Sequence, residues 1–187
     1  RKVPKATAYF SRENRDVLNN PKLNVIIDDG RNFLQKTTNK YDIITSDPIH
    51  PWLSGAGSLY SVEHFRSCKK RLNKGGIAAQ WLPLYEMPES DFKTVIKTFQ
   101  SVFPHTTLWL TDSDAILIGT EEKTRINYKE LAQRLKDEKL DNDMRMLYVD
   151  SVYQFLSFCM MREEKLSEYA ADAELNTDDY PILEFSA

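Results

Sequence analysis

The sequence has 187 residues, of which 25 are lysine or arginine and 28 are aspartate or glutamate, for a formal net charge of −3. A chain of this length forms one domain, or one domain with an appendage, and can bury roughly 70% of its unfolded surface. The content of 41% hydrophobic and 11% aromatic residues excludes a disordered chain. The small negative charge argues against nucleic-acid binding through bulk positive charge.

The two cysteines, Cys68 and Cys159, form neither a disulfide framework nor a zinc-ligand pattern. Both lie among apolar residues and are expected to be reduced core thiols, which favours a cytoplasmic location. No apolar run approaches the roughly 20 residues that a membrane span needs. The histidines and acids show no metal-ligand spacing, so no metal site is expected.

The first part of the sequence alternates apolar runs with helical periodicity, which is typical of an α/β sheet. A helix is predicted over residues 5–18 and a short buried strand over 23–28 (LNVIID). A short helix at 31–36 and a second strand at 41–46 (YDIITS) follow. The loop at 50–60 (HPWLSGAGSLY) contains two glycines and is expected either to close over a ligand or simply to connect elements.

Helix signals and apolar runs continue along the middle of the chain. Ser61 is expected to cap the next helix, and Gly75 and Gly76 are expected to end it. Residues 77–84 are predicted to form the third strand, and an apolar face then indicates a helix from Ser90 to just before Pro104.

The last part of the sequence predicts a hairpin followed by helices. Its two strands are expected at 107–110 and 115–119. A helix that begins near Asn127 and reaches about residue 140, and a second helix over 151–169, are predicted next. The tail AELNTDDYPILEFSA is expected to be an ordered loop with a short extended end.

Acids follow the first two predicted strands directly. In open α/β sheets, ligands bind at the carboxyl ends of the strands. Asp29 could there accept hydrogen bonds from an adenine amino group or a ribose hydroxyl, and Gly30 would let the backbone approach a ligand closely. A plain turn with solvated acids is the alternative interpretation.

Asp47 follows the second strand, so we expect its side chain at the same sheet edge as Asp29. A carboxylate there can orient an amine and accept its proton; an Asp-Pro turn without function is the alternative. Gln80, Trp81 and Tyr85, at or past the end of the third strand, are expected to line the same opening. Core packing of Trp81 is equally compatible with the pattern.

Several segments in this order resemble the spermidine synthase family of aminopropyltransferases. They are DDGRNFL, YDIITSDP, SLYSVEHF and LNKGGIAAQW, with NTDDYPILEF near the end. The resemblance is closest to a bacterial branch that is often fused behind a membrane domain. It implies an α/β fold with a Rossmann-like sheet of the S-adenosylmethionine-methyltransferase type, from which the first two strands are absent, followed by C-terminal helices.

The resemblance also implies a reaction and its residues. The family transfers an aminopropyl group from decarboxylated S-adenosylmethionine to an amine such as putrescine, without a permanently bound cofactor. Asp29 and Gly30 match the pair that contacts the adenine, and Asp47 matches the catalytic acid that accepts the amine proton. His50, Tyr60 and Gln80 are candidate substrate-binding residues.

Three departures from the family pattern leave other functions open. His50 stands where the family has a second aspartate, and LWLTDSDAILIG lacks the family's tyrosine segment for the amine. The glycine-rich loop that follows the family's first strand and the acid that follows the family's second strand are also missing from this sequence, so the donor pocket of this chain alone is expected to be incomplete. A methyltransferase that uses S-adenosylmethionine and a non-catalytic domain of a membrane protein are the alternatives.

The organisation implied by the resemblance has two parts. Residues 1–125 are expected to form a partial domain of the spermidine-synthase type, and 126–187 a helical extension and tail packed on it. Because the chain starts at Arg1 and not at methionine, the natural protein is expected to continue upstream. A homodimer, an upstream membrane domain and a position on the cytoplasmic face of an inner membrane are further expectations.

Overall fold

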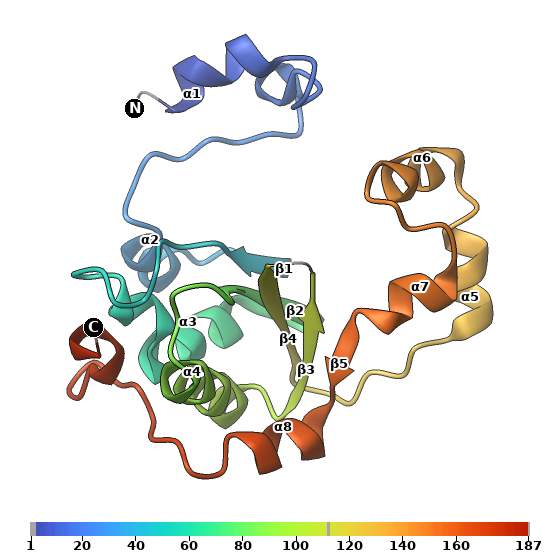
Figure 1. Cartoon of the computed structure of the whole chain (residues 1–187). Helices are drawn as coiled ribbons and strands as arrows, with labels where there is room; N and C mark the ends of the chain where they lie inside the picture. The colour runs from blue at the N-terminus through green and yellow to red at the C-terminus, as the bar shows by residue number, and fades with distance from the viewer. Residues whose placement is uncertain (1–2, 112, 187) are drawn as a thin grey trace. The chain divides into compact units, whose positions relative to one another are not determined.

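The computed structural model describes residues 3–111 and 113–186 (Figure 1). The chain divides into two compact units, Arg1–Thr37 and Thr38–Ala187, and each is described by itself. The division expected between residues 125 and 126 stays a prediction. Within the described ranges, every helix is too short or too polar to cross a lipid bilayer.

The first unit contains short helical segments instead of the helix predicted over 5–18. They are α1 (Val3–Ala6), the 3₁₀ helices η1 (Thr7–Phe10) and η2 (Val17–Asn19), and α2 (Gly30–Lys36). The prediction of one long helix was wrong. Arg15 and Asp16 both have φ of 53°, a left-handed backbone that a helix interior does not tolerate. Tyr9 is 87% exposed, so this segment buries no apolar face that would sustain a helix.

The strand predicted at 23–28 was also wrong. This run is irregular and pairs with no strand among the residues that the structure describes. Its apolar side chains are largely exposed, Ile26 by 52% and Ile27 by 63%. Because a strand needs a neighbour to satisfy its backbone groups, strand-forming residues alone do not produce one.

The second unit is built on a five-stranded mixed sheet. Its strands are β1 (Tyr41–Ser46), β2 (Leu72–Pro83), β3 (His105–Leu110), β4 (Asp114–Thr120) and β5 (Cys159–Met161). Their order is β1-β2-β4-β3-β5; β1 and β2 are parallel, and the other neighbouring pairs are antiparallel. The predicted second strand and the hairpin are confirmed.

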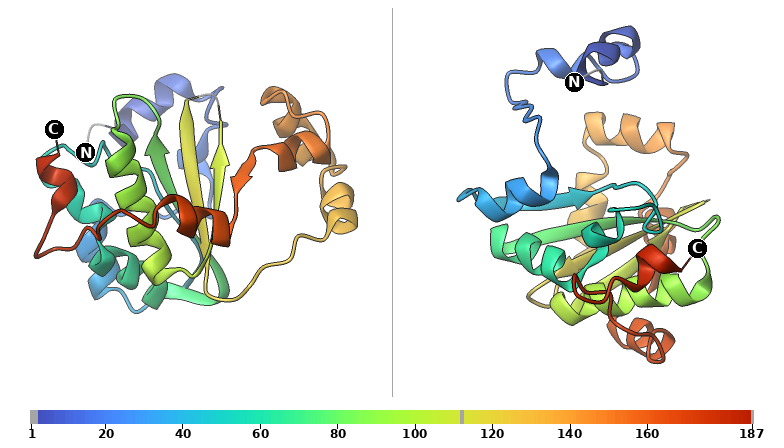
Figure 2. Two further views of the ribbon diagram at one scale, coloured as in Figure 1. Left: turned by 60° about the horizontal axis from the view of Figure 1, so that its bottom comes forward. Right: turned by 90° about the vertical axis from the view of Figure 1, so that its left-hand side faces the viewer.

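Two helices, α3 (Val62–Arg71) and α4 (Glu89–Val102), cover one face of the sheet (Figure 2). Ser61 caps α3 as predicted, because its Oγ accepts a hydrogen bond from the amide of His64 at 3.2 Å. The prediction that Gly75 and Gly76 end the helix was wrong, since both lie inside β2. Gly75 has φ of +75° in the stretch where the register between β1 and β2 shifts, so the glycines accommodate this irregularity.

The C-terminal part is more broken than predicted. It contains α5 (Tyr128–Arg134), α6 (Glu138–Met146), α7 (Val152–Ser157), α8 (Glu163–Tyr169) and the 3₁₀ helix η4 (Ile182–Phe185). The single helices predicted over 127–140 and 151–169 were wrong. The second is interrupted by β5, where Met161 pairs with Leu108 on β3. Backbone hydrogen bonds to a distant strand therefore replace helical ones between α7 and α8.

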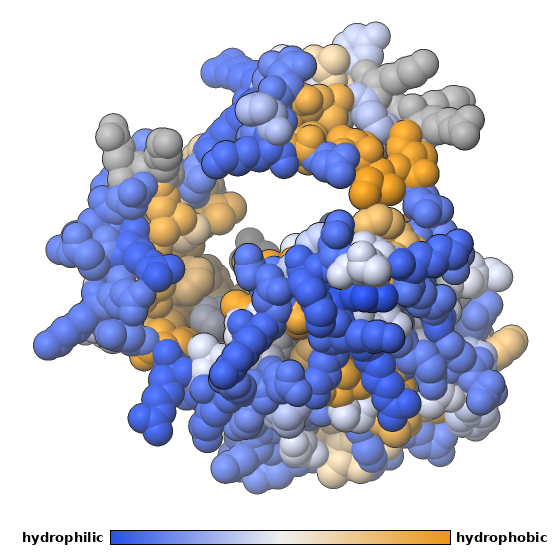
Figure 3. Space-filling model, turned by 180° about the vertical axis from the view of Figure 1, so that it is seen from behind, coloured by the Kyte–Doolittle hydropathy of each residue, from blue (hydrophilic) through white to orange (hydrophobic). Residues whose placement is uncertain are grey.

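The helices α5, α6 and α7 lie beyond the β5 edge of the sheet, away from α3 and α4 (Figure 1). The face in Figure 3 is mainly hydrophilic, and hydrophobic side chains appear on it over the α5–α7 segment. Exposed residues there include Met146, 74% exposed, and Leu147, 65% exposed. This segment thus buries less apolar surface than the sheet and its helices.

Both cysteines of the second unit are free thiols. Cys68 on α3 is buried, and burial raises its pKa to about 12. Cys159 on β5 is only partly buried. The prediction of a core thiol therefore fits Cys68 better than Cys159.

The core lies between α4 and the sheet, where the closest approach occurs at Gly119 on β4. A Cβ atom at Gly119 would lie 2.5 Å from Cε1 of Phe99 and 2.7 Å from Cβ of Phe103. Both phenylalanines are at most 1% exposed, so neither ring can move aside without disturbing the core. The absence of a side chain at this position allows α4 to pack directly on the strand.

We predict that Gly119→Ala lowers the free energy of unfolding by roughly 1–3 kcal/mol, the usual cost of overpacking a filled core. Urea denaturation followed by circular dichroism measures the change. Gly30→Ala is the matched control, because no atom lies within 4 Å of a Cβ placed there. Equal stability of the Gly119→Ala protein and the parent would contradict the packing described here.

Candidate functional site

The carboxyl ends of the parallel strands β1 and β2 lie side by side. Ser46, the last residue of β1, is paired with Gln80 on β2, and Asp47 follows Ser46 directly. The Asp47 side chain is exposed, whereas Gln80 is 1% exposed and its Nε2 donates a hydrogen bond to the carbonyl of Trp81 at 3.1 Å. This sheet edge therefore has the solvated carboxylate of Asp47 close to the buried, hydrogen-bonded amide of Gln80.

Tyr60, at the end of the 3₁₀ helix η3 (Gly57–Tyr60), is linked to the loop that follows Asp47. Its side chain is 0% exposed, and its hydroxyl donates to the carbonyl oxygen of Ile49 at 3.3 Å. Burial, and next the negative charge of Asp47, raise the pKa of Tyr60 well above its usual value. The phenol is thus neutral, supports the loop that follows Asp47 and lies within the electrostatic reach of that carboxylate.

His50 is surrounded by aromatic rings. Its imidazole stacks on Trp52, with ring centroids 4.7 Å apart and planes inclined by 10°. Trp81 lies 6.0 Å away, and Tyr85 meets the imidazole at 5.5 Å with nearly perpendicular planes. The structure therefore gathers Trp81 and Tyr85 beside the Asp47 loop, and it adds Trp52, which the sequence analysis did not single out.

The C-terminal tail holds the loop that carries these residues. Glu184 accepts hydrogen bonds from the amide of Gly55 at 3.0 Å and from the hydroxyl of Ser54 at 3.5 Å. Gly55 has φ of +82°, a conformation that favours glycine. The loop between Asp47 and Tyr60 is therefore tied to a residue near the end of the chain.

Asn176 is the anchor of this tail and is 0% exposed. Its Nδ2 donates to the carbonyl of Gly57 at 2.9 Å, and its Oδ1 accepts from the amide of Leu183 at 3.4 Å. Its backbone amide donates to Oγ1 of Thr98 at 2.9 Å, and its carbonyl accepts from the amide of Val62 at 3.0 Å. The sequence analysis missed this role of Asn176. Its only sign in the sequence was that Asn176 begins the segment NTDDYPILEF, which resembles the family.

Asp29 and Gly30 belong to the first unit, at the start of α2. Asp29 is the N-cap of this helix, and its Oδ1 accepts a hydrogen bond from the amide of Asn32 at 2.8 Å. A Cβ atom at Gly30 would meet nothing within 4 Å, so space is open above the backbone there. That Asp29 and Asp47 face one ligand stays a prediction, as do the roles of His50, Tyr60 and Gln80.

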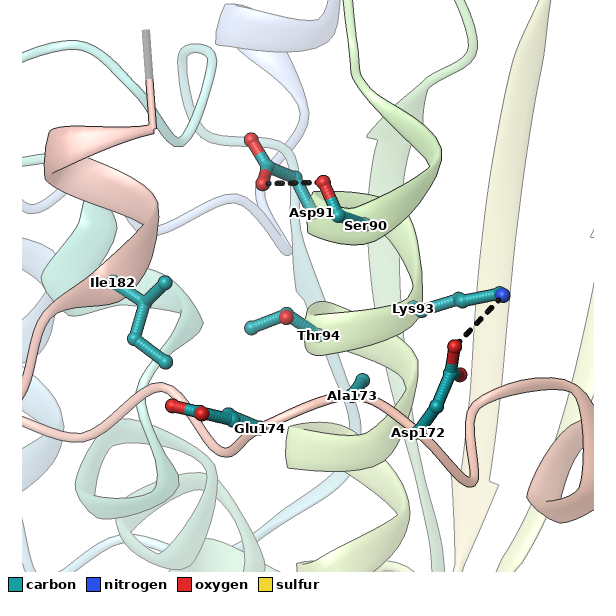
Figure 4. A pocket seen from close by; sticks show the side chains of 8 residues that line it. All are labelled: Ser90, Asp91, Lys93, Thr94, Asp172, Ala173, Glu174 and Ile182. Atoms are coloured by element: carbon teal, nitrogen blue, oxygen red, sulfur yellow. Dashed lines mark hydrogen bonds and ion pairs between the residues drawn. The ribbon is translucent and has the colours of Figure 1, made fainter.

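A cavity of about 360 Å³ lies between α4 and the tail (Figure 4). Two pairs of its polar side chains interact: Nζ of Lys93 is 3.4 Å from Oδ2 of Asp172, and the hydroxyl of Ser90 donates to Oδ1 of Asp91 at 3.4 Å. The predicted site residues do not line it. In the parts of the chain that the structure describes, no three histidine, cysteine or acidic side chains cluster as they would around a metal ion.

Comparison with known proteins identifies the family of this chain. Residues 5–112 match the family model described as spermine/spermidine synthase domain. The chain belongs to this family. The matched range contains all six candidate residues, namely Asp29, Gly30, Asp47, His50, Tyr60 and Gln80.

Curated relatives include polyamine aminopropyltransferases. The one from Buchnera aphidicola subsp. Schizaphis graminum is 29% identical over 142 residues, which cover 71% of this chain and 49% of the relative. The one from Klebsiella pneumoniae is 36% identical over 69 residues, which cover 37% of this chain and 24% of the relative. The chain thus spans about half the length of the Buchnera relative.

Solved structures show the same fold. A probable spermidine synthase from Corynebacterium glutamicum has a TM-score of 0.60 at 17% identity, over 91% of this chain and 61% of the other. Spermidine synthase from Thermotoga maritima has a TM-score of 0.63 at 14% identity, over 89% and 56%. The Rossmann-like, methyltransferase-type α/β fold predicted from the sequence is confirmed.

We predict that Asn176→Ala lowers the free energy of unfolding by roughly 1–3 kcal/mol, because the carbonyl of Gly57 and the amide of Leu183 lose a buried partner. Chemical denaturation measures the loss. Asn142→Ala, at an exposed position of α6, is the matched control and should change stability by at most about 0.5 kcal/mol. If the two variants are equally stable, Asn176 does not anchor the tail.

Proposed function

We propose that the protein transfers an aminopropyl group from decarboxylated S-adenosylmethionine to a small amine. The family match over residues 5–112 carries this proposal, because that range holds every candidate residue. The names of the curated relatives support the same reaction class. The proposal includes no permanently bound cofactor; the donor is a co-substrate.

The reaction is a displacement at carbon. The amine nitrogen attacks the propyl carbon bonded to the sulfonium, a C–N bond forms, and the C–S bond breaks with its electron pair going to sulfur. The sulfur leaves as a neutral thioether, so the leaving group needs no further activation. The substrate ammonium must lose one proton before its nitrogen can attack, and Asp47 is the proposed acceptor of that proton.

The exposure of Asp47 suits this role. Its carboxylate can reach an incoming ammonium, and the nearby phenol of Tyr60, which is buried and neutral, adds no competing charge. The loop is held by Glu184 and Asn176, so the carboxylate is presented from a fixed backbone. Positioning of the amine against the donor carbon then supplies much of the rate enhancement.

Asp29 and Gly30 are proposed to hold the adenine of the donor. The open space above Gly30 would admit a ring close to the backbone. A homodimer, an upstream membrane domain and a cytoplasmic location belong to the same proposal, as expectations drawn from the family resemblance.

We predict that Asp47→Asn lowers kcat by roughly 10²–10⁴-fold, the usual contribution of a general base. The assay uses the protein as its gene encodes it, with decarboxylated S-adenosylmethionine or S-adenosylmethionine as donor, and measures products by chromatography. Asp42→Asn, an exposed acid on β1, is the matched control and should retain activity. Turnover of Asp47→Asn at the parent rate would remove Asp47 as the base, and transfer of a methyl group would replace the proposed reaction.

We predict that Gly30→Ala weakens donor binding about tenfold or more without loss of stability. An alanine meets no atom of the chain there and has a higher helix propensity than glycine, so folding is unaffected or improved. Calorimetry with the donor, on the protein as its gene encodes it, measures binding, and thermal unfolding measures stability. Unchanged affinity would show that the backbone at Gly30 does not touch the donor.

A further inference from the structure

We infer that the cavity between α4 and the tail binds a short diammonium ion, with one ammonium group at each end, and that this ligand fastens the tail to α4. The cavity has a volume of about 360 Å³ and is lined by a set of residues that includes none of the six candidate site residues (Figure 4). The inference therefore concerns a second site and goes beyond the proposed reaction. It is carried by the charges of the cavity wall and by the positions of the two carboxylates in it.

The buried carboxylate of Asp91 lacks a positive partner. Asp91 lies in the first turn of α4 and is 5% exposed. Its Oδ2 accepts a hydrogen bond from the hydroxyl of Ser186 at 2.6 Å, and its Oδ1 accepts one from the hydroxyl of Ser90 at 3.4 Å. Both donors are neutral, and no cationic side chain pairs with Asp91 in the part of the chain that the structure describes. Because each carboxylate oxygen accepts more than one hydrogen bond and a buried charge is stabilised by a counter-ion, Asp91 can bind a cation.

The lysine in the cavity wall is already neutralised by other acids. Among the described residues that line the cavity, Lys93 carries the positive charge and Asp91, Asp172 and Glu174 carry negative ones. Nζ of Lys93 lies 3.2 Å from Oε1 of Glu89 and 3.4 Å from Oδ2 of Asp172. The carboxylates of Asp91 and Glu174 are left without a positive partner. The cavity wall therefore favours a ligand with two positive charges.

The two remaining carboxylates lie at opposite ends of the cavity. Figure 4 shows Asp91 at one end and Glu174 at the other, with the side chains of Thr94 and Ile182 between them. A ligand that reaches both ends needs a middle part that packs against the methyl groups of these two side chains. The volume is near the lower limit of roughly 300–1,000 Å³ for small-molecule sites, so this middle part is a short alkyl chain. A linear diamine, protonated at both ends, has this pattern of charge and apolar surface.

A diamine bound here joins two parts of the chain. Asp91 belongs to α4, whereas Glu174 and Ile182 belong to the tail, one before and one after Asn176. A ligand that binds the docked tail stabilises it in proportion to the ligand concentration. The hydrogen bond from Asn176 to the carbonyl of Gly57 then holds the loop of the candidate site more firmly. The cavity thus couples diamine concentration to the docking of the tail.

The test uses the protein as its gene encodes it, with the substitution Asp47→Asn to remove the carboxylate of the proposed active site. Calorimetry compares the binding of 1,4-diaminobutane with that of butylamine at constant ionic strength. We expect the diamine to bind about tenfold or more tightly than butylamine, because it alone forms charge-assisted hydrogen bonds at both ends. We also expect its addition to raise the Tm. Equal affinities of the two amines would overturn the inference.

Glu174→Gln in the same Asp47→Asn background isolates the cavity. Glu174 is exposed, and its side chain makes no hydrogen bond or ion pair with the described residues, so the variant should fold normally. The Kd for the diamine should rise about tenfold or more, toward the value for butylamine. Glu164→Gln removes an exposed acid of α8 and is the matched control, for which we expect an unchanged Kd. Equal diamine affinities of the Glu174→Gln and Glu164→Gln proteins would show that the cavity is not the site.

Hydrogen exchange of the Asn176 amide tests the fastening of the tail. This amide donates to Oγ1 of Thr98 on α4 at 2.9 Å, so its exchange reports the opening of the tail. We expect 1,4-diaminobutane to slow its exchange in the Asp47→Asn protein and to have little effect after Glu174→Gln. Exchange that is independent of the diamine in both proteins would overturn the proposed fastening.

The second site and the proposed reaction fail separately. If the diamine still binds through Glu174 but the protein forms no aminopropyl product, the reaction is wrong and the cavity site stands. If product forms but Glu174→Gln leaves the affinity for the diamine unchanged, the reaction stands and the cavity site is wrong.

Discussion

One buried amide fixes the part of the molecule on which the candidate site depends. Asn176 is fully buried; its side-chain amide bonds to Gly57 at the start of η3 and to Leu183 on η4, and its backbone bonds to Thr98 on α4 and to Val62 at the start of α3. An unpaired amide in this position would cost about 1–3 kcal/mol, so these partners are held together as a set. The loop that follows Asp47 is thereby positioned by a residue more than a hundred positions later in the sequence.

The candidate site combines buried, hydrogen-bonded residues with an exposed carboxylate. Tyr60 and Gln80 are buried and hydrogen-bonded to backbone carbonyls, so they support the loop and the strand end. Asp47 is exposed, and His50 is half-buried, with Nδ1 buried. Buried polar groups that are satisfied give rigidity, and the exposed carboxylate remains available for chemistry.

The sequence predicted the elements whose signals are local. Ser61 identified the start of α3, and the apolar spacing of α4 identified the helix that packs on the sheet. Prediction failed where a distant partner decides the structure: β5 interrupts a helical pattern because Met161 pairs with Leu108. For the candidate site, strand ends located Asp47, but the hydrogen bonds of Asn176 depend on tertiary contacts that no local pattern contains.

Two hexapeptides of the same chain show this condition most directly. LNVIID at 23–28 and YDIITS at 41–46 are both apolar, and both are followed by an aspartate. The second is β1, because Ile43 and its neighbours pair with Ile77 and the following residues of β2. The first has similar strand propensity but no ladder in the described part of the chain. Composition therefore sets only a preference for a strand, and an adjacent backbone that satisfies the amide and carbonyl groups turns this preference into structure.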